Sequence, residues 1–256
     1  MSKFQILILI LLTMSCSLDP VGETDATKVT VLAVLSPDYV RQTIMLVEGT
    51  NIFDVDGLYP SELDHPVQGA RMVVRSAKQT VEFTEVSPGL YQDAETQLQV
   101  VSGESYFLEV QEADGPELFA RTTVPGAFRI IAPEDSATFV IESEVAFSWQ
   151  RSSGAGTYVL GRNLFECEKE FFGRNFGFYG SFDKTQTKII AWINIFCNSS
   201  LQAQTFKVLA YDSSLAAYLY SVDSNGAPLQ RSNIDGGLGV FGSMVSDSLT
   251  IVVTSQ

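Results

Sequence analysis

A cysteine near the start of the chain has the sequence context of a lipidation site. Cys16 follows the residues Leu-Thr-Met-Ser, so a small serine directly precedes the thiol, as lipoprotein signal peptidase requires. Thr13 stands where this lipobox pattern usually has a leucine. We predict cleavage after Ser15 and acylation of Cys16, palmitate included. The alternative is an ordinary secretory leader in which Cys16 is incidental.

The residues before Cys16 have the composition of a signal peptide. Lys3 supplies a positive start, and residues 4–12 form an apolar run, interrupted only by Gln5, that is too short to span a bilayer. We therefore expect a signal peptide at 1–15 and a lipidated tether at 16–27. Two or more acyl chains, at about 0.8 kcal/mol per buried methylene, would hold the protein at a membrane. Ser17 in place of an aspartate favours the outer membrane, on either its periplasmic or its surface face.

The other two cysteines, Cys167 and Cys197, both lie in the second half of the chain. In an oxidising compartment we expect them to form a disulfide, which would contribute roughly 3 kcal/mol by closing a loop of about thirty residues. Two free buried thiols are the alternative. Because His65 is the only histidine, a zinc site and a base-activated thiol are both disfavoured. We predict no metal site, no cofactor and no catalytic residue.

Aromatic residues are concentrated among glycines between residues 165 and 180. We expect part of this run to form a contact surface for a protein or a glycan, and the candidate residues are Phe171, Phe172, Phe176, Phe178 and Tyr179. In the alternative interpretation these rings cap one end of a sandwich beneath the cysteine bridge.

A second glycine-rich segment spans residues 232–242 and reads Ser-Asn-Ile-Asp-Gly-Gly-Leu-Gly-Val-Phe-Gly. Glycines allow backbone N–H groups to approach a phosphate closely, but this segment lacks the lysine and the Ser/Thr of a Walker loop. We expect instead a turn that lets Val240 and Phe241 enter the core before the last strand. An acidic stretch around Asp54 and Asp56 suggests either a calcium loop or, as we expect, a solvated insertion.

The balance of charge narrows the range of partners. The chain has 16 Lys and Arg against 30 Asp and Glu, a formal net charge of −14. Removal of residues 1–15 takes away only Lys3, which leaves −15. An excess of negative charge of this size argues against nucleic acid as a partner.

Short β-branched and aromatic runs separated by turn residues predict two tandem antiparallel β-sandwich domains. The first, at 28–125, resembles sandwiches of the carboxypeptidase-regulatory type, because a Gly-Ala strand start at Ala70 precedes a Gly-x-Tyr hairpin at Tyr91. The second, at 126–256, reads as a fibronectin-like or immunoglobulin-like sandwich with a buried Trp149 opposite a Tyr-x-Leu strand. Apolar spacing predicts one short helix near 213–222, with Asp212 as its N-cap.

Taken together, these patterns resemble a family of Bacteroidota envelope lipoproteins, domain-of-unknown-function family 4249. The segment at 232–242 is the most distinctive match, and the lipobox, the Phe147-x-Trp149 strand and the Tyr218-x-Tyr220 helix add to it. The resemblance implies an envelope location, two β-rich domains and a TonB-dependent outer-membrane receptor as partner. It implies no activity.

We therefore predict a non-enzymatic, lipid-anchored outer-membrane protein that binds, or is accessory to, a receptor or transporter. A structural or adhesive surface lipoprotein is the alternative. A carbohydrate-active enzyme that uses carboxylates such as Glu142 and Glu144 is a third hypothesis.

Overall fold

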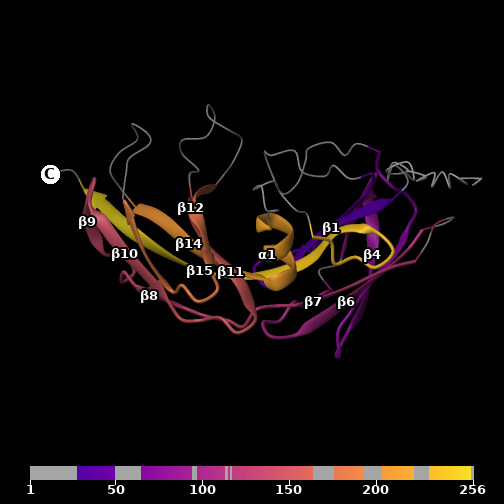
Figure 1. The fold of residues 1–256 in the computed structure, drawn as a ribbon, viewed down its shortest axis with the longest axis horizontal. Coiled ribbons are helices and arrows are strands. Elements are labelled where there is room, and N and C mark those ends of the chain that lie inside the picture. The colour runs from indigo at the N-terminus through magenta and orange to yellow at the C-terminus, as the bar shows by residue number, and fades with distance from the viewer. Residues whose placement is uncertain are drawn as a thin grey trace, which may run out of the picture.

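Two lobes of β-strands lie side by side in the computed structural model, with one helix where they meet (Figure 1). The structure describes residues 28–49, 65–93, 97–112, 115, 117–163, 176–192, 203–221 and 231–254. The first lobe contains β1 (Val29–Leu35), β2 (Thr43–Glu48), β3 (Arg71–Arg75), β4 (Thr80–Ser87), β5 (Leu90–Gln92), β6 (Ser105–Gln111) and β7 (Glu117–Thr123). The second contains β8 (Ile130–Ala132), β9 (Thr138–Val140), β10 (Glu144–Trp149), β11 (Ala155–Asn163), β12 (Phe176–Asp183), β13 (Lys188–Trp192), β14 (Ala203–Asp212) and α1 (Ser213–Tyr220). The last strand, β15 (Leu238–Thr254), belongs to both lobes.

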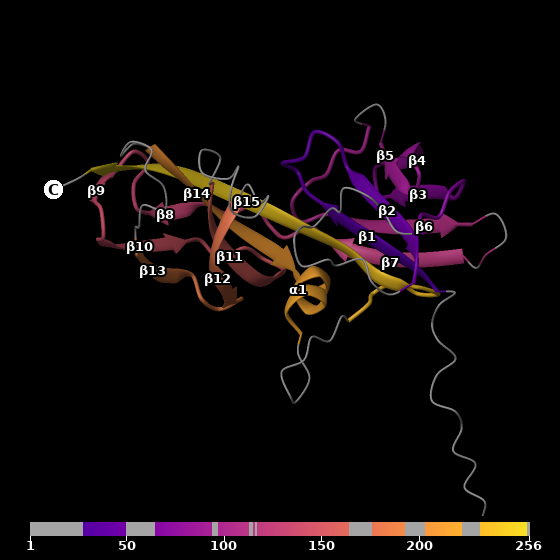
Figure 2. The same ribbon diagram turned by 90° about the horizontal axis from the view of Figure 1, so that it is seen from above.

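The strands form one large sheet and one small sheet. Twelve strands make up the large sheet, in the order β12-β11-β14-β15-β1-β2-β5-β4-β3-β6-β7, with β9 paired to β15 beside this path. The small sheet has the order β13-β10-β8. The large sheet therefore runs through both lobes, and it passes from one to the other at β15 (Figure 2).

β15 is 17 residues long and changes partner along its length. Its first part runs parallel to β1, with Gly239 opposite Val31. Its second part runs antiparallel to β14, with Met244 opposite Tyr211, and its last residues pair in parallel with β9. One continuous strand thus supplies backbone hydrogen bonds to both lobes.

β1, in the middle of the large sheet, is buried on both of its faces. All seven of its residues are buried, and alternate side chains enter two different clusters. Val31 and Leu35 belong to the main core, whereas Leu32 and Val34 belong to a second cluster on the other face of the sheet. Burial on both faces explains why this strand is an almost continuous run of apolar residues.

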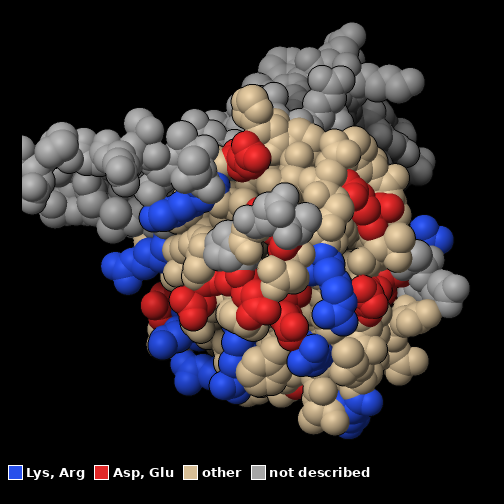
Figure 3. Space-filling model, turned by 90° about the vertical axis from the view of Figure 1, so that its right-hand side faces the viewer, with Lys and Arg blue, Asp and Glu red and all other residues tan. Residues whose placement is uncertain are grey.

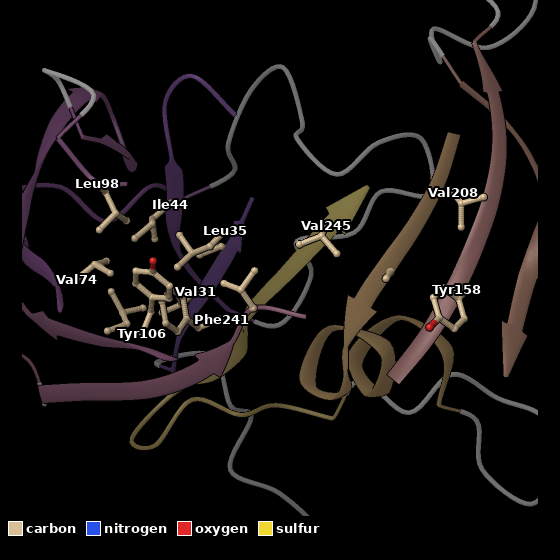
Figure 4. Close-up of a cluster of buried hydrophobic side chains, with 14 of the residues drawn as sticks. Val31, Leu35, Ile44, Val74, Leu98, Tyr106, Tyr158, Val208, Phe241 and Val245 are labelled. Carbon is tan, nitrogen blue, oxygen red and sulfur yellow. The ribbon is translucent and has the colours of Figure 1, made fainter. Parts of the chain in front are cut away.

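The main core extends from the first lobe into the second without a break. Figure 4 shows side chains of this cluster from Val74 and Tyr106 in the first lobe, through Phe241 and Val245 on β15, to Tyr158 in the second. The second cluster also joins the lobes, since it contains residues of β1 and β2 together with residues of β11, β14, β15 and α1. The two lobes share their hydrophobic cores.

The predicted fold class, mostly β-sandwich with one short helix, is confirmed. Trp149 packs on Tyr158 as expected, with ring centroids 5.5 Å apart. The helix begins at Ser213 after the N-cap Asp212, whose side chain accepts a hydrogen bond from the Leu215 N–H. Leu215 and Tyr218 are the buried positions of this helix, as their spacing predicts.

The C-terminal strand differs from the sequence-based expectation. We expected the glycine-rich segment at 232–242 to form a turn before the last strand, but β15 begins at Leu238, inside that segment. The expected boundary after residue 125 assigns residues 238–243 to the second lobe, yet they pair with β1 of the first. The pairing is also parallel rather than antiparallel. Partners about 200 residues apart in sequence leave no local turn signal from which such a pairing could be predicted.

A buried tyrosine explains the spacing of the predicted Gly-Ala and Gly-x-Tyr elements in the first lobe. The Tyr91 hydroxyl accepts a hydrogen bond from the Ala70 N–H (3.1 Å) and donates one to the Val67 carbonyl (3.0 Å). Burial raises the pKa of Tyr91 above its ordinary value, so the hydroxyl stays neutral and available as a donor. The tyrosine thereby holds the start of β3 against β5.

We predict that Tyr91→Phe lowers the free energy of unfolding by about 1–3 kcal/mol, because it leaves the buried Ala70 N–H without its partner. Urea unfolding followed by circular dichroism measures the loss. Tyr220→Phe is the matched control, since 43% of Tyr220 is exposed, and we expect a change below about 0.5 kcal/mol. Equal losses in the two variants would contradict this role of the Tyr91 hydroxyl.

Candidate functional site at the glycine-rich junction

The structure describes only some of the residues that the sequence analysis proposed as functional. Cys16, Cys167, Cys197, Phe171 and Phe172 lie outside the described residues. The backbone positions of Phe176, Phe178 and Tyr179 lie in β12, the last strand at one end of the large sheet. Lipidation, the disulfide and the aromatic contact surface therefore stay predictions.

The glycine-rich segment lies where the two lobes meet, and its asparagine connects three stretches of chain. The Asn233 side chain accepts a hydrogen bond from the Phe241 N–H (2.9 Å) and donates to the carbonyls of Phe241 (2.9 Å) and Arg121 (3.1 Å). Two residues later, Asp235 and Phe119 exchange backbone hydrogen bonds of 2.8 and 3.1 Å. This segment therefore joins β7 to β15. We call it, together with the residues it contacts, the glycine-rich junction.

All four glycines of the junction stand where a side chain would collide with the first lobe or the helix, and Gly239 and Gly242 show this most clearly. Gly239 has a positive φ of 99°, and a Cβ at this position would overlap the carbonyl oxygen of Val31. A Cβ at Gly242 would lie 2.7 Å from the Cβ of Leu215 in α1. Val240, between them, is fully buried, as is Phe241, which confirms that this segment enters the core. Close packing of strand on strand and strand on helix accounts for both glycines.

A buried carboxylate completes the junction. Asp212 is only 4% exposed, and its Oδ1 accepts hydrogen bonds from the N–H groups of Leu215 (2.9 Å) and Ser243 (3.2 Å). Its Oδ2 accepts one from the Thr122 hydroxyl (2.8 Å), which itself lies 2.8 Å from the Ser243 hydroxyl. Asp212 thus caps α1 and at the same time links β7 to β15.

The electrostatics of Asp212 reflect its burial. Removal from water raises the pKa of this carboxyl above its ordinary value, and the hydrogen bonds from Leu215, Thr122 and Ser243 oppose the shift without cancelling it. Elsewhere, Lys207 lies 3.9 Å from Asp38, which also contacts the Ser246 hydroxyl, so the β1–β2 turn is tied to β14 and β15. Polar contacts between the lobes therefore supplement the shared core.

One exposed surface was not predicted from the sequence. Phe107 on β6 and Phe119 on β7 are 48% and 44% exposed, and the Arg121 guanidinium stands over the Phe107 ring at 5.3 Å. We call these three residues the aromatic–arginine face. A signal was present, because Phe107 lies between two buried positions of β6, Tyr106 and Leu108, and alternation must turn it outward.

Charge is unevenly distributed on the first lobe. Figure 3 shows its outer end, where Asp and Glu gather across the middle of the face and Lys and Arg surround them. Cross-strand ion pairs such as Arg75–Glu109, with 2.9 Å between nitrogen and oxygen, place opposite charges on neighbouring strands. Glu142 and Glu144, the carboxylates of the enzyme hypothesis, are both exposed.

The described residues form neither a cluster of metal ligands nor a membrane-spanning helix. Among these residues, no three His, Cys, Asp or Glu side chains come together in a group that could hold a metal ion. The described part of the chain contains no helix with the length and apolar character needed to cross a membrane.

We predict that Gly239→Ala destabilises the protein far more than Gly103→Ala. Both glycines have a positive φ, so both variants lose about 1–2 kcal/mol to backbone strain. Only the Cβ at residue 239 meets backbone atoms, whereas the space around Gly103 is open, and we expect an additional loss of at least about 2 kcal/mol. Thermal unfolding of both variants measures the difference, and equal losses would show that the contact with Val31 is unimportant.

The raised pKa of Asp212 predicts a dependence of stability on pH. A carboxyl whose pKa is higher in the folded state stabilises the fold fully below its unfolded value of 3.8, and this contribution is lost as pH rises through the folded value. We therefore expect the stability of the wild type relative to Asp212→Asn to be greatest at acid pH and to decline towards neutrality. Melting temperatures from pH 3.5 to 7 test this, and an advantage that grows with pH would contradict it.

The comparisons with known proteins give a family and no activity. Among solved structures, the fibronectin(III)-like modules of Clostridium thermocellum CbhA are 11% identical, with a TM-score of 0.25, and the match covers 50% of this chain and 98% of that one. The chicken CNTN1 FN1–FN3 domains are 12% identical over 88% of this chain and 69% of that one, with a TM-score of 0.27. A glucan-utilisation protein of Bacteroides ovatus, SGBP-B in complex with a mixed-linkage heptasaccharide, is 14% identical over 87% of this chain and 43% of that one, with a TM-score of 0.21.

No curated protein matches the chain. The family described as "Domain of unknown function (DUF4249)" matches residues 17–250. This match covers nearly the whole chain beyond the predicted signal peptide and includes the glycine-rich junction. The chain therefore belongs to the DUF4249 family.

Proposed function

We propose that this protein is a non-enzymatic lipoprotein of the outer membrane that binds a receptor or transporter there and is accessory to it. The observation that carries the proposal is the aromatic–arginine face, which is exposed on the lobe that follows the predicted lipidation site and its tether. Phenylalanine and arginine are enriched where proteins meet, and an arginine held over a ring presents a flat surface with little freedom left to lose on binding.

The anchor would keep this face near the membrane. Acyl chains on Cys16 would be followed by eleven tether residues, 17–27, before β1 begins the first lobe. Even fully extended, eleven residues reach at most about 40 Å. Phe107 and Phe119 belong to the same lobe, so they would stay within reach of a partner embedded in the same membrane.

The roles of the buried carboxylates support a binding protein rather than an enzyme. Asp93 and Asp212 are the buried acidic residues of the described chain. Asp93 accepts hydrogen bonds from the N–H groups of Gln42 (2.7 Å) and Leu98 (3.2 Å), and Asp212 holds the junction together. Both carboxylates are engaged in positioning backbone. We propose a TonB-dependent receptor as the partner, which the family resemblance implied.

Affinity purification from crosslinked membranes, followed by mass spectrometry, tests the proposal. We expect the native lipoprotein to recover a stoichiometric outer-membrane receptor, and Cys16→Ala to lose it because the protein is no longer anchored. The double variant Phe107→Ser and Phe119→Ser should retain the anchor and recover at least about tenfold less receptor, in keeping with loss of a contact worth more than about 1.4 kcal/mol.

A matched control distinguishes loss of the proposed contact from a general effect of replacing exposed apolar side chains. Ile131 and Ile190 are also exposed, by 61% and 57%, but lie in the second lobe. We expect Ile131→Ser with Ile190→Ser to bind as the native protein does. If the native protein recovers no receptor, the structural or adhesive alternative gains weight. If both double variants bind equally well, the aromatic–arginine face is not the contact.

A further inference from the structure

The sheet of the first lobe has two ends, and the C-terminal part of the chain reaches both. Counted from β1, the order is β1-β2-β5-β4-β3-β6-β7, so β1 and β7 are the outermost strands of this lobe. Residues 238–243 pair with β1, and Asp235 and Asn233 bond to the backbone of β7 at Phe119 and Arg121. A segment of about ten residues therefore closes the first lobe from one end of its sheet to the other.

The closing segment also fills the interior of the first lobe. Phe241 is fully buried in the main core, and Ile234, which belongs to the same core, is 7% exposed. Without this segment, β1 would present a seven-residue edge that contains no charged residue. Such an edge pairs readily with other chains, which is why natural proteins cover or charge it.

We infer that residues 231–243 act as an intramolecular closing strand. The first lobe is closed when this segment is bonded to both β1 and β7, and it reaches that state only when the C-terminal part of the chain docks on it. Val31 and Gly239, which lie opposite each other, are more than 200 residues apart in sequence. Contacts this distant in sequence form late, after most of the loop entropy has been lost. The N-terminal lobe then stays open until nearly the whole chain is available.

Pulsed hydrogen exchange during refolding of the full chain tests this order. Amides of β1 and β2 should gain protection in the same kinetic phase as residues 238–243. Protection of β1 and β2 in an earlier phase, while 238–243 still exchange freely, would overturn the inference. The wild-type result alone decides between these outcomes, so the test does not require any variant to fold.

A pair of matched variants sharpens the test. Asn233→Ala removes three side-chain hydrogen bonds of the closing segment, and we expect it to slow protection of β1, β2 and 238–243 together by roughly three- to tenfold. Gln79→Ala is the control, because the Gln79 amide makes two comparable hydrogen bonds to Gln99 inside the first lobe. It should leave that common phase unchanged. Slowing of 238–243 without slowing of β1 would contradict closure by this segment.

Discussion

Pairing of one long strand with both lobes is the constraint on which the rest of this structure depends. β15 hydrogen-bonds in parallel to β1 through its first part and antiparallel to β14 through its second. Because each lobe shares this strand, the two hydrophobic clusters extend across the boundary rather than stopping at it. The lobes are therefore held together by backbone hydrogen bonds and by core packing, both stronger constraints than a flexible linker.

The unusual residues of the glycine-rich junction follow from this pairing. β15 must approach β1 closely, which requires a glycine opposite Val31, and it must pass beneath α1, which requires a glycine beside Leu215. The Phe241 and Ser243 N–H groups of β15 need hydrogen-bond partners. The side chains of Asn233 and Asp212 supply them. The most distinctive motif of the sequence thus serves architecture, and the proposed contact with a partner lies elsewhere, on the exposed aromatic–arginine face.

Local signals in the sequence were sufficient for much of the fold. The helix at 213–220 was predictable because an N-cap and apolar spacing both lie within ten residues. The Trp149–Tyr158 contact was predictable because the two residues lie on strands that are consecutive in the chain. The parallel pairing of β1 with β15 was not, since alternation and turns indicate strands but do not say which distant strand lies beside which. Recognition of the glycine-rich segment as part of the core was correct, but its assignment to a turn before the second lobe's last strand missed its contact with the first.

For the candidate binding surface, too, some features could be predicted from the sequence and others could not. The aromatic run at 165–180 was conspicuous by composition, whereas Phe107 and Phe119 are single outward positions on ordinary strands, 48% and 44% exposed. Only the cross-strand register, which sets Phe107 opposite Arg121 and Phe119 opposite Glu109, brings them into one surface. A pattern along one strand cannot show which side chains lie across from it on the next.

Differential scanning calorimetry of the intact protein tests the central claim, that β15 makes the two lobes one cooperative unit, most directly. A single transition whose calorimetric enthalpy equals its van't Hoff enthalpy is the result we predict. Two resolved transitions, or a calorimetric enthalpy about twice the van't Hoff value, would show that the lobes unfold independently and would contradict the claim.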